Sequence, residues 1–166
     1  MMAFPPEDFF WSIGADLMAL HLFCCLFMTG LIWTMQLVHY PAFRFVEPTR
    51  FADFHRFHSS RMTWVAAPVM TLELLTAALI AWTGSTLAYI NLASVLLVWL
   101  LTFAVSVPLH NRLSKPREGE ATEDQNAKTI RRLILSNWSR TAVWTLRSLL
   151  LTALLAHTLR YALQVS

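Results

Sequence analysis

The stretch LMALHLFCCLFMTGLIWTMQLV, residues 17–38, decides the fold because it contains no acidic side chain, lysine or arginine. An α-helix rises about 1.5 Å per residue, so about 20 apolar residues cross the hydrocarbon core of a bilayer. Three further predominantly apolar runs follow, at about residues 63–82, 88–109 and 138–157. The sequence therefore predicts an all-α integral membrane protein built as a four-helix bundle.

The composition agrees with a lipid environment. Hydrophobic residues make up 56% and charged residues 14% of the chain, against roughly 45–50% and about 25% in soluble domains. The length of 166 residues favours a single transmembrane domain over residues 1–166. The basic residues are dispersed between apolar segments, so no nucleic-acid partner is expected. We expect the lipid bilayer as the main partner and leave a homo-oligomer open.

The connections between the spans predict the orientation. Residues 83–86 (TGST) predict a tight turn between the second and third spans, and the polar residues 111–128 predict a flexible loop. Apart from Arg160, the 13 basic residues lie at 44–61 and 112–147. The positive-inside rule then places both long connections in the cytoplasm and both termini outside a plasma (inner) membrane. The acidic start does not fit a cleaved signal peptide, so the first span is expected to remain in the protein.

The segment FADFHRFH, which begins at Phe51, is amphipathic when it is drawn as a helix. At 100° per residue, His55 and His58 share the face of Phe51, whereas Asp53 and Arg56 lie opposite. The pattern predicts a short interfacial amphipathic helix between the first and second spans. If its apolar face packs under the bundle, both imidazoles point inward.

Four histidines are predicted to converge at the cytoplasmic end. His39 closes the first span and His110 closes the third, so the two lie at similar depth, next to His55 and His58. Histidine is the commonest metal ligand, and imidazole suits copper, iron and zinc. We therefore predict that these four bind copper or iron, with zinc less favoured, or a haem. The alternative is that each is an interfacial residue or caps a helix C-terminus.

The remaining histidines and the cysteines have simpler interpretations. His21 and His157 lie near the outer face and are expected to be interfacial anchors. Cys24 and Cys25 are adjacent in an apolar helix, where they point about 100° apart. They are expected to remain unpaired and to pack as small hydrophobic residues.

Charged side chains also lie inside the predicted spans. Glu73 in the second span and Arg147 in the fourth lie at comparable depth, and an unpaired charge there costs about 2.5–3.5 kcal/mol. One interpretation is a structural Glu73–Arg147 pair. The other is catalytic: Glu73 as a metal ligand or proton relay, with Arg140 and Arg147 binding an anionic group such as a haem propionate or a substrate carboxylate.

Three polar residues near these groups are candidates for cofactor binding. Gln36 and Ser106 precede His39 and His110 by about one turn, and Asn137 lies near Arg140. They could orient the imidazoles by hydrogen bonds. Alternatively, they bond one helix to another.

Four motifs carry a resemblance to known proteins. They are QLVHYPAF (36–43), FHRFHSSRMTW (54–64), VPLHNRLS (107–114) and NWSRTAVWTLR (137–147). Together they resemble a group of uncharacterised bacterial four-helix membrane proteins. More distantly, Val-Pro-Leu-X-Asn (107–111) and Asn-X-X-Arg-Thr (137–141) are similar to the anthrone-oxygenase-like family of membrane proteins. That likeness implies an oxygenase or oxidoreductase.

The leading hypothesis is a haem- or transition-metal-binding membrane oxidoreductase that acts at the cytoplasmic end of the bundle. A lipid-soluble small molecule is a candidate substrate. One alternative is a non-enzymatic membrane scaffold or subunit with Glu73 and Arg147 as a structural pair. Another is a small transporter that uses Glu73 and Arg147 along its path.

Overall fold

The computed structural model describes the backbone of residues 7–115 and 121–165, and the side chains of residues 14–115 and 124–164. Every regular element in these ranges is helical. The α-helices are α1 (Glu7–Thr34), α2 (Tyr40–Ala42), α3 (Pro48–Ala81), α4 (Thr86–Leu101), α5 (Val107–Leu113) and α6 (Ala121–Val165). Two π-helices, η1 (Met35–His39) and η3 (Thr102–Ser106), and one 3₁₀ turn, η2 (Phe43–Phe45), join them.

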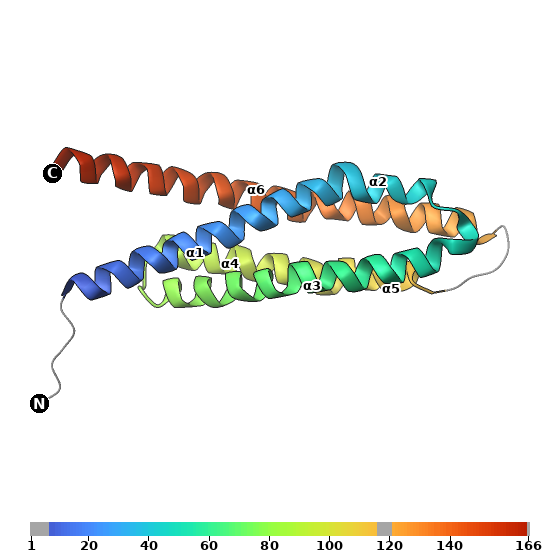
Figure 1. The fold of residues 1–166 in the computed structure, drawn as a ribbon, viewed down its shortest axis with the longest axis horizontal. Coiled ribbons are helices and arrows are strands. Elements are labelled where there is room, and N and C mark those ends of the chain that lie inside the picture. The colour runs from blue at the N-terminus through green and yellow to red at the C-terminus, as the bar shows by residue number, and fades with distance from the viewer. Residues whose placement is uncertain (1–6, 116–120, 166) are drawn as a thin grey trace, which may run out of the picture.

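The elements form four long rods that run alternately up and down (Figure 1). α1 continues through η1 to η2, α4 continues through η3 to α5, and α3 and α6 are each uninterrupted. The start of α1, the end of α6 and the α3–α4 turn lie at one end, which we call the terminal end. The η2–α3 connection, the end of α5 and the start of α6 lie at the opposite, connection end. All four rods are long and apolar enough to cross a membrane. The predicted multi-pass four-helix bundle is confirmed.

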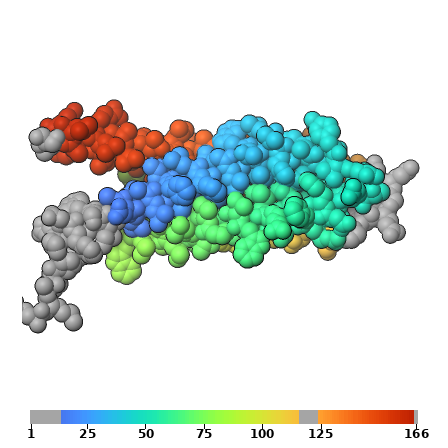
Figure 2. Space-filling model, viewed as in Figure 1, coloured from blue at the N-terminus to red at the C-terminus, as the bar shows by residue number. Residues whose placement is uncertain are grey.

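The outer surface of the bundle suits lipid. Figure 2 shows the face on which α1 and α3 lie side by side. Trp64 of α3 and Trp82, which caps the C-terminus of α3, are 77% and 92% exposed, and a helix places them about 27 Å apart. That spacing is close to the hydrocarbon thickness of about 30 Å, and tryptophan is enriched at both interfaces. The first turns of α3, which carry His55 and His58, then lie at the membrane surface on the connection side.

The turn between α3 and α4 confirms the tight connection expected at residues 83–86. Gly84 adopts φ 76°, in a left-handed region that suits glycine. Its N–H donates to the carbonyl of Ala81 at 3.0 Å. Ser85 caps α4, because its hydroxyl accepts a hydrogen bond from the N–H of Ala88 at 3.2 Å.

Two helix boundaries differ from the sequence-based expectations. The amphipathic segment forms as expected, but it is the start of α3 and not a separate helix, because nothing between Pro48 and Ala81 interrupts it. α6 begins at Ala121, so residues 121–128 are helical and not part of a flexible loop. Asp124 and Lys128 form an i,i+4 pair at 2.5 Å that supports this first part. Residues 116–120 of the expected loop lie outside the described residues.

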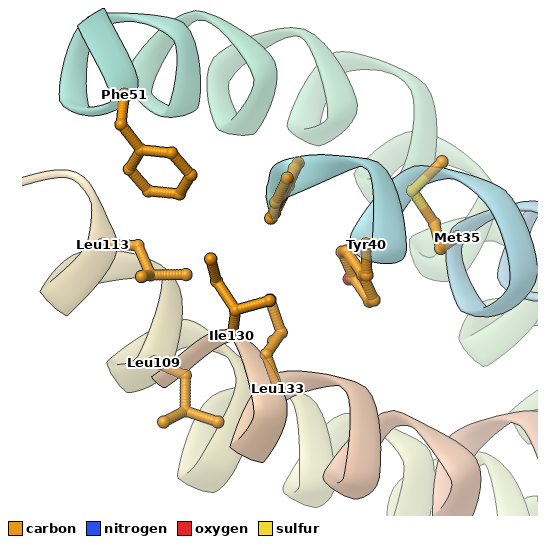
Figure 3. Packing of buried hydrophobic residues seen from close by; sticks show 8 residues of the cluster. Met35, Tyr40, Phe51, Leu109, Leu113, Ile130 and Leu133 are labelled. Carbon is orange, nitrogen blue, oxygen red and sulfur yellow. The ribbon is translucent and has the colours of Figure 1, made fainter. Parts of the chain in front are cut away.

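Two apolar clusters fill the bundle. The cluster at the connection end joins all four rods, and Figure 3 shows its side chains pointing toward one another: Met35, Tyr40, Phe51, Leu109, Leu113, Ile130 and Leu133. The second cluster lies deeper and includes Cys25, Met28, Met70 and Trp144. The two cysteines are fully buried and unpaired, as expected.

Candidate functional site

The four predicted histidines meet at the connection end. The ring centroids of His39 and His58 are 4.1 Å apart, and those of His55 and His110 are 5.1 Å apart. The His58 and His110 rings lie 6.3 Å apart, which joins the two pairs. His55 and His58 face inward because they share the buried face of α3 with Phe51. The predicted convergence is confirmed.

Hydrogen bonds link two of these imidazoles into a chain that crosses three rods. The hydroxyl of Tyr40 lies 3.4 Å from Nε2 of His110. Nδ1 of His110 lies 3.1 Å from Nε2 of His55, whose Nδ1 lies 2.9 Å from the hydroxyl of Ser114. Every member can both donate and accept a proton. The side chains from Tyr40 to Ser114 therefore form one continuous hydrogen-bonded chain from the bundle interior to the end of α5.

The same contacts determine what the cluster offers to a metal. The facing nitrogens of His55 and His110 bond each other, and His39 stacks on His58. Within residues 14–115 and 124–164, no three His, Cys, Asp or Glu side chains are arranged to hold a metal ion. Nε2 of His39 is nevertheless buried without a hydrogen-bond partner. Binding of copper, iron or haem stays a prediction.

The two π-helices lie beside this cluster. η1 ends at His39 and η3 ends at Ser106. Each is followed by a proline, Pro41 or Pro108, which lacks the N–H that an α-helix would use there. π-helical turns inside α-helices occur frequently at functional sites. They contribute Met35, Thr102, Phe103 and Ser106 to the wall of the cavity described next.

A cavity of about 310 Å³ lies inside the bundle, next to the histidines and on their side toward the terminal end. The part of the cavity toward the connection end is polar, with Tyr40, His58, Ser106, His110 and Arg140 in its wall. The part toward the terminal end is lined by apolar side chains, among them Met28, Met70, Trp99 and Trp144. The volume is at the small end of the range of ligand pockets, and the combination of apolar walls with a few polar groups is typical of them.

The cavity reaches the lipid-facing surface between α3 and the η3–α5 segment. Thr63 and Ala67 on α3, with Phe103 and Val107 opposite, line the cavity and are exposed. Thr63 adjoins Trp64, so this mouth lies near the level at which hydrocarbon meets headgroups.

Arg140 reaches the cavity from α6. It is 7% exposed, and it donates to the hydroxyl of Thr102 at 3.3 Å and to Oδ1 of Asn137 at 2.5 Å. Its Nε is buried without a hydrogen-bond partner. The hydroxyl of Tyr40 lies beside its guanidinium group. Among the described side chains, no carboxylate pairs with it.

Glu73 and Arg147 form the predicted ion pair, with 2.7 Å between Oε1 and Nη1. Trp144 donates its indole N–H to the second carboxylate oxygen at 3.1 Å. Arg147 also donates to Oδ1 of Asn91 at 3.2 Å. Glu73 neutralises the charge of Arg147 in this arrangement, and binding of an anionic group by Arg147 stays a prediction.

His21 belongs to this network, which corrects its expected role as an interfacial anchor. It is fully buried, and its Nε2 accepts from Nδ2 of Asn91 at 2.9 Å. Its Nδ1 lies 2.8 Å from the hydroxyl of Thr76, which donates to the carbonyl of Leu72. The prediction for His21 was wrong because the sequence of one helix does not show whether a side chain faces the other helices or the surface of the bundle. His157 is exposed.

The predicted partners of the imidazoles instead bond one helix to another. Oε1 of Gln36 accepts from Nδ2 of Asn137 at 2.8 Å, and Nε2 of Gln36 donates to the carbonyl of Ile134 at 3.2 Å. These bonds join η1 to α6. Through Asn137 they also hold Arg140 in place. Ser106 is buried and lines the cavity.

Sequence reasoning found the histidines and the charged residues but missed the cavity. Its apolar wall comes from residues on four rods, and no periodicity in one helix reveals a gap between several. The prolines after His39 and in VPLH were the one available signal, because proline perturbs a helix about one turn before itself.

No family model matches the chain, and the comparisons with curated proteins and with solved structures give no match. The likeness to anthrone-oxygenase-like proteins stays a prediction.

Proposed function

We propose that this protein is a membrane-embedded enzyme that takes a lipid-soluble molecule into the cavity and transfers a proton to or from it. The hydrogen-bonded chain of Tyr40, His110 and His55 is the acid–base group. Proton transfer of this kind is the part of an oxidoreductase or oxygenase reaction that these side chains can perform.

One observation carries the proposal: the hydrogen-bonded chain ends in the wall of a cavity whose mouth lies on the exposed surface of the apolar spans. Tyr40 and His110 both line that cavity. Histidine is the most frequent general acid–base group near neutral pH. The exposed mouth at Ala67 supplies an entry route that does not pass through water. The basic residues around the site support a cytoplasmic position for this end.

The test begins with the molecule that copurifies with the protein. We expect solvent extraction of the purified protein, followed by mass spectrometry, to release a small apolar compound. Ala67→Trp, which narrows the mouth, should abolish its recovery. Ala78→Trp is the matched control, because Ala78 is also exposed on α3 but does not line the cavity.

Chemistry is then separated from binding. His110→Gln should retain the compound but slow its conversion in membranes by about 100-fold or more, as expected for the loss of a general acid–base group. Wild-type protein without any extractable compound, or equal recovery from the Ala67→Trp and Ala78→Trp variants, would contradict the proposal.

A second candidate function is binding of copper, iron or haem by the histidine cluster, for oxidoreductase chemistry. It is favoured by the approach of four imidazoles and by the unpartnered Nε2 of His39. Elemental analysis and an absorption spectrum of the purified protein test it. His39→Ala and His110→Ala should abolish a stoichiometric metal or a haem band, and His157→Ala should not.

A further inference from the structure

We infer that the cavity binds a carboxylic acid with a single hydrocarbon chain. Its carboxylate would bind Arg140, and its chain would lie among the methionine and tryptophan side chains of the apolar part of the cavity. The inference rests on the proposed function and names its ligand class.

The first observation is the difference between two buried arginines on one helix. Arg147 has a carboxylate at 2.7 Å, whereas the partners of Arg140 are all neutral: Thr102, Asn137 and the hydroxyl of Tyr40. A buried cation needs an anion, and an unsatisfied buried N–H needs an acceptor. Arg140 lacks both among the described side chains. A carboxylate from a ligand would supply both.

The second observation is the order of side chains along the cavity. Arg140, Tyr40 and His110 lie toward the connection end, and Met28 and Met70 lie in the deeper apolar cluster. One end therefore suits a charged head and the other suits hydrocarbon. Methionine is flexible and fits apolar chains of irregular shape. This polarity matches an amphiphile with one head and one chain.

The third observation is depth. Arg140 lies about half a turn along α6 from Trp138, which is 43% exposed and contacts Trp33 edge-on. The mouth of the cavity begins next to Trp64 of α3. Tryptophan marks the headgroup level, so Arg140 lies close to the depth at which a bilayer-dissolved carboxylic acid holds its head. The ligand would therefore need to move little along the membrane normal to enter the cavity.

Guanidinium recognises carboxylate through charge-assisted hydrogen bonds, and its planar shape matches two oxygens. The Nε–H of Arg140 is free for such a bond. Asn137 holds the group from the other side, and Asn137 is in turn fixed by Gln36. The guanidinium is thus oriented before a ligand arrives.

The experiment compares dodecanoic acid with 1-dodecanol, which has the same chain and no charge. Binding to the purified protein in a neutral sugar detergent at pH 8 is measured by native mass spectrometry. We expect the wild-type protein to bind one dodecanoate and to prefer it to dodecanol by at least tenfold. Arg140→Gln should remove this preference while dodecanol binding remains.

Arg132→Gln is the matched control, because it removes an arginine from the exposed face of α6, and it should keep the full preference. Arg140→Lys should keep part of it. If Arg140→Gln does not fold, the preference of the wild-type protein and of Arg140→Lys for acid over alcohol still tests whether Arg140 binds the carboxylate. Equal binding of acid and alcohol to the wild-type protein would contradict recognition of a carboxylate by Arg140, but it would still agree with a cavity that binds lipid-soluble molecules. Binding of neither would overturn both.

Discussion

Glu73 and Arg147 are buried between the rods, where they are 1% and 5% exposed. Their ion pair is supported by hydrogen bonds from Trp144 to the carboxylate and from Arg147 to Asn91. With His21, the network touches all four rods. A buried pair adds little to stability compared with apolar residues, but breaking one leaves an uncompensated charge. The pair therefore fixes how the rods align.

Glu73→Gln tests this at the scale of the residue. The substitution keeps the shape of the side chain but leaves Arg147 buried beside a neutral group. We expect the free energy of unfolding to fall by about 3–5 kcal/mol, measured by thermal unfolding in detergent. Asp53→Asn, which changes an exposed carboxylate on the same helix, should leave stability nearly unchanged. A stable Glu73→Gln protein would show that the pair is dispensable.

Single residues were predictable where a helix face was informative. The inward orientation of His55 and His58 followed from the position of Phe51, and the pairing of Glu73 with Arg147 followed from depth and charge. The bonds of Gln36 to Asn137 and of His21 to Asn91 were not predictable individually, because they depend on how neighbouring rods are rotated.

At the scale of the element, the two π-helices distinguish α1 and α4 from regular spans. A π-turn holds one more residue than an α-turn, because its hydrogen bonds reach from i to i+5. The extra residue shifts the side chains within the turn without changing the phase of the flanking helices. In η1 this turn contains His39, and in η3 it contains Ser106 at the cavity wall.

Deletion of Ala104 tests this assignment. Removing an exposed residue from η3 should restore an α-helical turn and keep both flanks in register, so helicity and thermal stability should be largely retained. Deletion of Ala93, also exposed but in regular α4, should rotate the remainder of the rod by about 100° and unfold the bundle. Circular dichroism during heating measures both. Equal damage from the two deletions would contradict the role of the π-turn.

The hydrophobic runs predicted the four spans, but not where the helices end. Length and apolarity report only the part of a helix inside hydrocarbon. The polar starts of α3 and α6 extend beyond it and are held by the connection-end cluster, to which α3 contributes Phe51 and α6 contributes Ile130. Such contacts join segments distant in sequence, so periodicity within one segment does not reveal them.

For the whole molecule, the distribution of basic residues predicts which side each end faces. The connection end should be cytoplasmic and the α3–α4 turn should face outward. In cells, Thr83→Cys should react with a membrane-impermeant maleimide, and Lys128→Cys should react only after the membrane is opened. Cys24 and Cys25 are fully buried and give little background. The opposite labelling pattern would invert the topology.

The mouth between Ala67 and Phe103 lies on the exposed surface of the apolar spans. Under the proposed function, the ligand therefore reaches the cavity from the bilayer and not from the buffer. Occupancy of the cavity will follow the mole fraction of a compound among the lipids, and not the amount per volume of buffer. Adding empty vesicles to a fixed quantity of compound would dilute it and lower occupancy, although nothing else in the sample had changed.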